Sequence, residues 1–202
     1  MKYLFFDIEC ANCNDRRGKI YSFGYIIADE GLNVIEDEKD IVMNPDVDKW
    51  DWYVLKNILA YSKKDVESKS KFNKHYNKIK RLLEDEETIV CGFSVKDDVG
   101  YILDECERYK LEPIKIRFFD IQRLEAKISG SDNKGLGEAY ISWCKQLPLG
   151  AHRSDVDAKF TLDLAKEICK KQKKTLQEFI LEDESLSGKT DGFKYGFNDE
   201  QL

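Results

Sequence analysis

The sequence predicts a mixed α/β protein in which helices pack against a β-sheet. Three segments of strand character come first, at residues 2–9, 20–28 and 33–43. Helix-like and strand-like segments then alternate along the chain, a pattern typical of parallel strands joined through helices. The chain has 202 residues, of which 42% are hydrophobic. That length and composition predict about one domain with a sizeable core.

The first three strands are expected to form one unit. Residues 2–9 are a mostly apolar run, and residues 20–28 are a second. Asp29-Glu30-Gly31 is typical of a hairpin turn between the second and third strands. Two further strands are predicted at residues 88–93 and 114–119, which brings the total to five.

Helices are predicted between and after these strands. The clearest is residues 155–171, because its apolar side chains recur at every fourth position, as on one face of a helix. The other predicted helices are residues 50–60, 65–83, 98–109, 122–128, 137–146 and 175–181. Residues 1–181 are interpreted as the main domain, and residues 182–202 as either a loose tail or a docked extension.

Charge and composition exclude several classes of protein. The net charge is −6, from 33 basic and 39 acidic residues, which argues against a basic protein that coats nucleic acid. No apolar run reaches the ~18 residues of a membrane helix, and the first residues lack the features of a signal peptide. We therefore expect a cytoplasmic location with no membrane partner. The six cysteines are then expected to be free thiols.

Two acidic residues lie within the otherwise apolar first strand. Because side chains alternate along a strand, Asp7 and Glu9 are expected to point to the same face. Two unpaired carboxylates there would repel each other and would be costly to desolvate. A bound divalent cation would relieve both problems, and Mg²⁺ or Mn²⁺ would suit oxygen ligands better than zinc. The alternative is that the strand ends at Ile8 and both acids face solvent.

Further candidates lie at the starts of two predicted helices. Asp97 and Asp98 follow the strand at residues 88–93, where an aspartate can also act as a helix cap. His152 precedes the helix at residues 155–171, and Asp157 lies in its first turn, five residues later. The other histidine, His75, is expected to be a surface residue.

Together these residues resemble the DEDD (DnaQ-like) family of 3′–5′ exonucleases. The similarity is to its subgroup with a catalytic histidine, the RNase T and proofreading-exonuclease type. That family has an Asp-x-Glu on its first strand, an Asp after a later strand, and a His followed by an Asp five residues later. The matching residues here are Asp7, Glu9, Asp98 (or Asp97), His152 and Asp157. The order and spacing fit across about residues 1–171.

The sequence departs from the family pattern in two places. The middle motif usually has His-Asn shortly before its Asp, whereas residues 92–98 here read GFSVKDD. Asp98 is preferred over Asp97 because Tyr101 and Ile102 then occupy the family's apolar pair. After Asp-x-Glu the family often has two threonines, whereas here Cys10-Ala11 follows, so contacts to the terminal nucleotide are expected to differ.

The resemblance implies an RNase H-like fold with a five-stranded mixed sheet. It also implies hydrolysis of single-stranded RNA or DNA from the 3′ end to nucleoside 5′-monophosphates. Two Mg²⁺ or Mn²⁺ ions would be held by Asp7, Glu9, Asp98 and Asp157, with Asp7 bridging both. His152 is the candidate general base, because histidine changes charge near neutral pH. A homodimer or a polymerase partner is left open.

Three alternatives remain at this point. The first is a catalytically decayed protein of the same fold that binds nucleic acid or a protein partner. The second is a proofreading module associated with a polymerase. The third is a zinc or redox site at Cys10 and Cys13, although no second cysteine pair accompanies them. Trp50 and Phe72 are weighed as residues that stack on bases or pack in the core.

Overall fold

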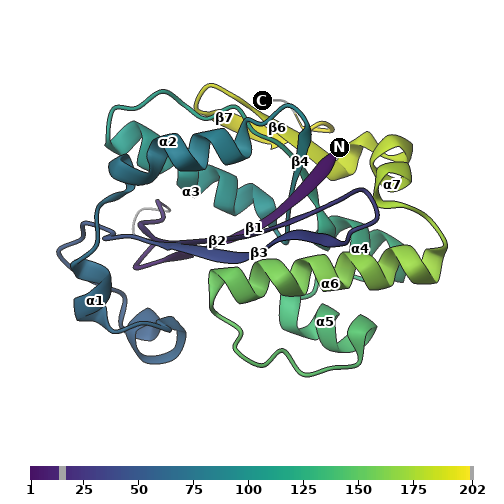
Figure 1. The fold of residues 1–202 in the computed structure, drawn as a ribbon, viewed down its shortest axis with the longest axis horizontal. Helices are drawn as coiled ribbons and strands as arrows, with labels where there is room; N and C mark the ends of the chain where they lie inside the picture. Colours follow the sequence, from purple (N-terminus) through teal and green to yellow (C-terminus); the bar gives the residue numbers. More distant parts are fainter. Residues whose placement is uncertain (14–16, 201–202) are drawn as a thin grey trace.

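The chain forms a seven-stranded sheet with helices on both faces, as seen in a computed structural model that describes residues 1–13 and 17–200 (Figure 1). The strand order is β3-β2-β1-β4-β5-β6-β7. β1 pairs in parallel with β4, and β4 with β5, whereas the other neighbours are antiparallel. The strands are β1 (Lys2–Cys10), β2 (Ile20–Ala28), β3 (Val34–Val42), β4 (Thr88–Gly92), β5 (Arg117–Asp120), β6 (Ser187–Asp191) and β7 (Lys194–Phe197).

The mixed α/β architecture is as predicted, but the expected count of five strands was wrong. All five predicted strands are present, and residues 187–197 add the hairpin β6–β7 to the edge formed by β5. The sequence left residues 182–202 open between a loose tail and a strand-like extension docked on the domain, and the structure has the docked strands. Its Gly188 lies against the Phe118 ring of β5, where a Cβ would come within 2.3 Å of a ring carbon. Residues 201–202, the end of the predicted tail, lie outside the described residues.

The helices match the predicted segments except between β3 and β4. The helix expected at residues 50–60 is only a short π-helix, η2 (Val54–Ile58), none of whose residues is buried. The helix expected at 65–83 is two helices, because Asn44 pairs with residues 70 and 71 and interrupts it. The helices are α1 (Lys63–Glu67), α2 (Phe72–Leu83), α3 (Val95–Arg108), α4 (Ile121–Ser129), α5 (Leu136–Cys144), α6 (Ser154–Gln172) and α7 (Leu176–Glu182), with a 3₁₀ turn η3 (Glu184–Leu186).

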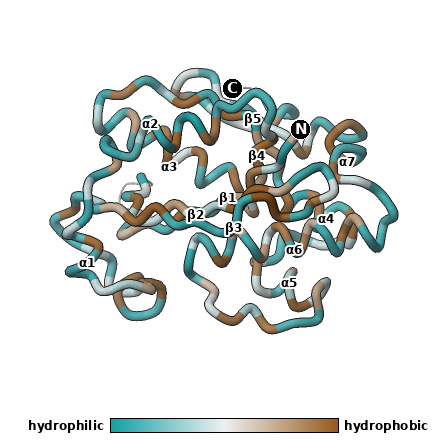
Figure 2. The backbone as a smooth tube through the Cα atoms, in the orientation of Figure 1, coloured by the Kyte–Doolittle hydropathy of each residue, from teal (hydrophilic) through white to brown (hydrophobic). Residues whose placement is uncertain are grey.

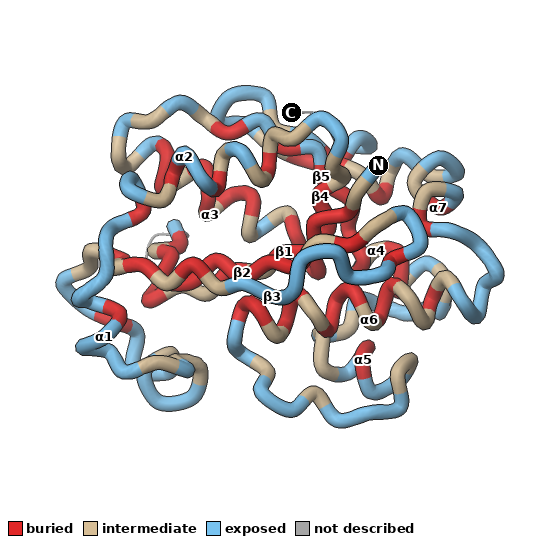
Figure 3. The backbone as a smooth tube through the Cα atoms, viewed as in Figure 1, coloured by how far each residue is buried: buried red, intermediate tan, exposed pale blue. Residues whose placement is uncertain are grey.

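Each face of the sheet has its own hydrophobic core. Helices α2 and α3 cover one face, where Leu4, Phe6 and Ile8 of β1 are buried (Figure 1). Helices α4 and α6 cover the other face, where Tyr3 and Phe5 are buried. The most hydrophobic and most deeply buried stretches meet at the central strands (Figures 2 and 3). Alternation along β1 therefore directs Asp7 and Glu9 toward the α6 face.

The outer strand β3 is mostly exposed and carries many charges (Figure 3). Charged side chains on an edge strand oppose pairing with other chains. In the described parts of the chain, no helix is long and apolar enough to cross a membrane.

Candidate active site

The candidate site lies on the α6 face, where β1 leaves the hydrophobic core. Asp7 pairs in register with Gly24 of β2, and Glu9 pairs with Ser22. Gly24 in turn pairs with Asp40 of β3. Paired residues point to the same face of a sheet, so Asp7, Gly24 and Asp40 form a row across three strands.

Gly24 allows helix α6 to lie directly on this row. A Cβ at Gly24 would stand 2.0 Å from the backbone carbon of Ser154 and from the backbone nitrogen of Asp155. No side chain fits at that distance. The first turn of α6, which carries Asp157, therefore lies between Asp7 and Asp40 only because position 24 is a glycine.

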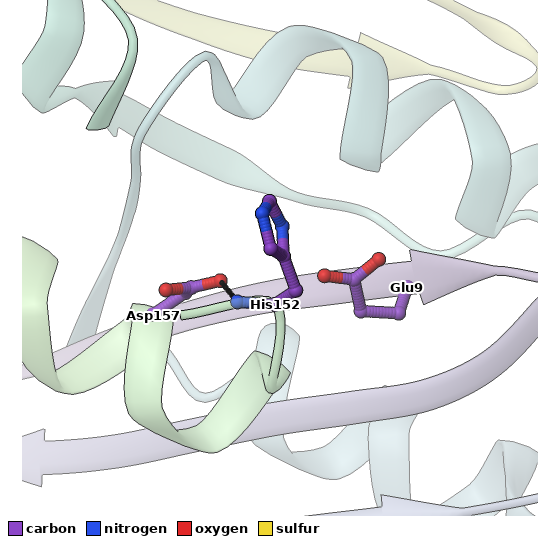
Figure 4. Close-up of side chains that lie close together, drawn as sticks. All are labelled: Glu9, His152 and Asp157. Atoms are coloured by element: carbon purple, nitrogen blue, oxygen red, sulfur yellow. Dashed lines mark hydrogen bonds between the residues drawn. The ribbon is translucent and has the colours of Figure 1, made fainter. Parts of the chain in front are cut away.

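His152 is held next to Asp157 through its backbone. Its φ of 69° is left-handed, and its backbone N–H donates to Asp157 Oδ2 at 2.9 Å. Figure 4 shows this bond as a dashed line, with the Glu9 carboxylate directed toward His152 from β1. Ligand atoms of Glu9, His152 and Asp157 all lie within 4.8 Å of one another. Asp157 is buried, whereas His152 is exposed to solvent.

Helix α3 supplies the fourth carboxylate. Asp98 is half-buried and Asp97 is exposed, so these adjacent residues face different surroundings. The charge on Asp98 raises the pKa of Asp7, and the charge on Glu9 raises the pKa of Asp98. The structure therefore brings Glu9, His152 and Asp157 within ligand distance of one another, and Asp7 and Asp98 interact electrostatically with this group. Asp98 is the more buried of the two adjacent aspartates.

Burial and mutual repulsion dominate the electrostatics of this carboxylate cluster, which comprises Asp7, Glu9, Asp98 and Asp157. Burial is the largest cause of the shift in each case. It raises the pKa of Asp7 and of Asp98 well above the usual range for aspartate. Burial, together with the charges of Asp157 and Asp40, raises the pKa of Glu9 to about 8. Burial also raises the pKa of Asp157 to about 6, although the hydrogen bond from His152 opposes that shift.

No lysine or arginine within residues 1–13 and 17–200 makes an ion pair with any member of the carboxylate cluster. Four carboxylates without a cation are unfavourable while ionised. Oxygen donors in this number suit a divalent cation, which would also remove the repulsion. The donor set therefore fits the metal ions expected from the sequence.

A buried polar network that the sequence did not reveal supports the start of α6. The Asp40 carboxylate accepts hydrogen bonds from Ser22 Oγ at 2.8 Å and from the Tyr61 hydroxyl. Ser154 Oγ lies 3.4 Å from Asp40 Oδ1 and also bonds Ser22 Oγ. Asp40 gave no sequence signal because β3 is charged along most of its length. Only the register of β3 on β2 distinguishes Asp40 from its neighbours.

The prediction for His75 was wrong, whereas Trp50 and Phe72 take one of the two roles that the sequence left open. His75 is half-buried rather than on the surface, and burial lowers its pKa. Trp50 and Phe72 are 4% and 1% exposed, so both pack in the interior and are not available to stack on bases. By contrast, Trp52 and Tyr53 are 68% and 60% exposed, and neither was singled out.

The two cysteines that follow Glu9 contact each other. Cys10 and Cys13 share a thiol hydrogen bond, which is the largest cause lowering the pKa of Cys13 to about 6. Across the described ranges, one group of three or more metal-binding side chains is found, and it is Glu9, His152 and Asp157. The pair therefore lacks the further ligands of a zinc site.

Residues 4–165 match the sequence model of the RNase T exonuclease family. The chain belongs to this exonuclease family. The resemblance to DEDD exonucleases seen in the sequence is thereby confirmed, and the family implies dependence on divalent metal ions. No curated protein sequence matches the chain.

Solved structures of exonucleases share the fold. A 3′-exonuclease that recognises the 3′ end of the histone mRNA stem-loop aligns with a TM-score of 0.77 at 12% identity, over 100% of this chain and 92% of that one. The DEDDh nuclease domain of 3′hExo bound to rAMP gives 0.72 at 13% identity, over 84% and 92%. The zinc-bound exonuclease I of E. coli with single-stranded DNA gives 0.69 at 16% identity, over 90% of this chain but 43% of that one. These similarities confirm the RNase H-like fold.

Proposed function

We propose that this exonuclease-family protein removes nucleotides from the 3′ end of single-stranded nucleic acid and releases nucleoside 5′-monophosphates. Residues 1–181 form the exonuclease domain in this proposal, extended by residues 182–202. The observation that carries it is the carboxylate cluster. Three elements far apart in sequence, β1, α3 and α6, bring its four carboxylates together in an exonuclease-family fold, without an ion-paired lysine or arginine in the described ranges.

Asp7, Glu9, Asp98 and Asp157 would hold two Mg²⁺ or Mn²⁺ ions. Bound there, the ions would supply positive charge to the scissile phosphate and make a water molecule more acidic. Raised pKa values are consistent with this assignment, because each carboxylate gains more from a nearby cation than an exposed one would.

His152 would take the proton from the attacking water. The oxygen of that water forms a bond to phosphorus, the bond from phosphorus to the 3′-oxygen breaks, and the leaving oxygen is protonated. Exposure leaves the imidazole free to meet a substrate, while the backbone bond to Asp157 fixes the position of its Cα. Asp157 therefore has two functions in this proposal, as a metal ligand and as an anchor for the general base.

Labelled oligonucleotides test the proposal. Single-stranded DNA and RNA labelled at either end are incubated with Mg²⁺, Mn²⁺, Zn²⁺ or EDTA. We expect stepwise shortening of 5′-labelled strands and release of the label as a mononucleotide from 3′-labelled strands, with no reaction in EDTA. Full activity in EDTA would rule out the metal mechanism.

Two modified substrates test the polarity. A 3′-terminal phosphate adds charge and bulk where the 3′-hydroxyl should lie, so it should slow the reaction. Duplex ends should react more slowly than single strands, because freeing a paired terminal base costs a few kcal/mol. Cleavage of a circular single strand at the rate of a linear one would identify an endonuclease instead.

A further inference from the structure

A cavity of about 600 Å³ lies at the ends of β4 and β5, and β4 is the neighbour of β1 in the sheet. Helices α3 and α4 begin at its wall, and Asp97, the neighbour of Asp98, is one of its lining residues. The opposite wall is the C-terminal segment, residues 183–200, through Leu186, Phe197 and Glu200. The cavity thus lies between the starts of two helices and a part of the chain that lies beyond the family match at residues 4–165.

Three basic side chains line this cavity. Lys96 comes from the first turn of α3, and Arg123 and Lys127 come from α4. Arg123 and Lys127 are four residues apart, so they lie on the same face of that helix. The Arg123 guanidinium stacks 3.8 Å from the centre of the Phe197 ring, which holds its orientation. We refer to these three residues as the basic triad.

Each member of the basic triad is paired with an acid from the C-terminal segment. Lys96 pairs with Glu200, and Lys127 pairs with Asp183. Arg123 Nη2 lies 3.0 Å from Asp199 Oδ2. The acids Asp183, Asp199 and Glu200 are called the C-terminal acids below.

Backbone amides at the two helix starts contribute less to this cavity than its basic side chains. Asp120 is 2% exposed, and its Oδ1 accepts from the backbone N–H groups of Ser94 and Gln122 at 3.2 and 2.8 Å. It thereby uses donors that could otherwise bind an anion at a helix N-terminus. The positive charge of the cavity wall therefore comes from the basic triad, which stands beside the lining acids Asp97, Asp120, Asp183 and Glu200.

We propose that the basic triad binds phosphate groups of the nucleic-acid strand whose 3′ end lies at the carboxylate cluster. The C-terminal acids stay ion-paired with the triad until the phosphates of a strand replace them. This inference rests on the proposed function, and it adds a second contact region for the same substrate. Lys96, Arg123 and Lys127 side chains are 37%, 26% and 57% exposed. Ion pairs this exposed are weak, so phosphates can displace the acids.

The affinity for a single-stranded oligonucleotide, measured without hydrolysis, tests whether the basic triad binds the strand. The affinity of a short single-stranded oligonucleotide with a 5′ fluorophore is measured in EDTA at several salt concentrations. The combined variant Lys96→Gln, Arg123→Gln and Lys127→Gln should bind at least about tenfold more weakly. Its salt slope should fall by about 2, because each lost phosphate contact to a single strand removes about 0.7.

The matched control removes the same charge elsewhere. Lys63, Lys159 and Lys174 are each ion-paired with an acid away from the cavity. Their combined replacement by Gln should change the affinity by less than about threefold. Equal losses in the two triple variants would overturn the proposal, because the effect would then reflect net charge alone.

The opposite change tests the role of the C-terminal acids and does not depend on the stability of the triad variant. Asp199→Asn with Glu200→Gln should tighten strand binding several-fold, since the triad no longer has to exchange partners. Glu67→Gln with Asp163→Asn is the matched control. Unchanged or weaker binding in the first pair would overturn the proposal that the acids compete with the strand.

Two further measurements separate this inference from the proposed function. If the wild type degrades strands but the triad variant binds like its control, the second contact region is wrong and the nuclease function stands. If the wild type degrades nothing but binding is lost with the triad, the contact region stands alone. An equal loss of affinity for AMP would assign the cavity to the mononucleotide product and overturn its assignment to the strand.

Discussion

The C-terminal acids and the carboxylate cluster differ in how their negative charge is balanced. In the C-terminal acids, each carboxylate has a lysine or arginine partner, and the hydrogen bond from Lys127 is the largest cause that lowers the pKa of Asp183 to about 2. In the carboxylate cluster, burial raises the pKa of Glu9 to about 8. One set is neutralised by basic side chains of the chain itself. The other has no lysine or arginine partner in the described ranges, and in the proposed function metal ions would balance its charge.

Removal of one carboxylate from the cluster should have the largest effect. We expect Asp7→Asn to lower turnover by about 10⁴-fold, because a ligand of the proposed metal ions is lost. The variant should stay folded in EDTA, where it has one less repelling charge. Single-turnover hydrolysis and thermal unfolding with and without Mn²⁺ measure both effects. The exposed acid Asp132 provides the control, and Asp132→Asn should be as active as the wild type.

Asp97 and Asp98 are adjacent, but Asp97 lines the cavity whereas Asp98 belongs to the carboxylate cluster. We expect Asp98→Asn to lower turnover by about 10³-fold. Asp97→Asn should change kcat by less than about threefold, and any effect should appear in KM because Asp97 lines the cavity. The opposite ranking in steady-state kinetics would move the metal ligand to Asp97.

His152 should act on protons and not hold the ions. We expect His152→Ala to lower kcat by about 10²-fold, within the usual range for a general base. The acidic limb of the rate–pH profile should flatten, while the increase in melting temperature given by Mn²⁺ should persist. A variant that loses the metal response as fully as Asp7→Asn would identify His152 as a ligand.

The carboxylate cluster depends on close packing of α6 against Gly24, and a substitution at Gly24 tests this dependence. We expect Gly24→Ala to reduce the free energy of unfolding by about 3 kcal/mol, because the new methyl group would overlap the start of α6. Activity should fall as well, since Asp157 and His152 move with that turn. Gly135→Ala is the control, because a Cβ there meets nothing within 4 Å. Chemical denaturation compares the two.

The pH dependence of the free energy of unfolding in EDTA should show the repulsion within the carboxylate cluster directly. The folded-state pKa values of Glu9 and Asp157, about 8 and about 6, lie above those of unfolded chains. The folded protein therefore binds more protons than the unfolded chain between about pH 4.5 and 8. Stability should fall across that interval as pH rises, by several kcal/mol. Mn²⁺ should reduce the slope, and a flat EDTA profile would contradict the repulsion.

The part of this site that follows from local sequence could be predicted. Strand alternation placed Asp7 and Glu9 on one face, and helix spacing placed Asp157 in the first turn of α6. Contacts that depend on register between strands could not be predicted. Asp40 joins the site only because it pairs with Gly24, and nothing in the charged run of β3 singles it out.

The same limit applies to the C-terminal segment. Its alternating aromatic residues left a loose tail and a docked strand equally open, and the fit of Gly188 against Phe118, some 70 positions earlier in the sequence, could not be read from them. The break before α2 also coincides with a contact between distant residues, the pairing of Asn44 with Ser70 and Lys71. Local periodicity carries no information about such contacts.

The position of the β6–β7 hairpin has a consequence for biosynthesis. β5 lies inside the finished sheet, yet its second neighbour is formed by residues 187–191. During translation, at about 5–20 residues per second, β5 stays an open edge with Phe118 and Phe119 until that hairpin leaves the ribosome. Open apolar edges recruit strands from other chains. The nascent protein therefore passes through an interval, several seconds long, in which aggregation competes with completion of its own sheet.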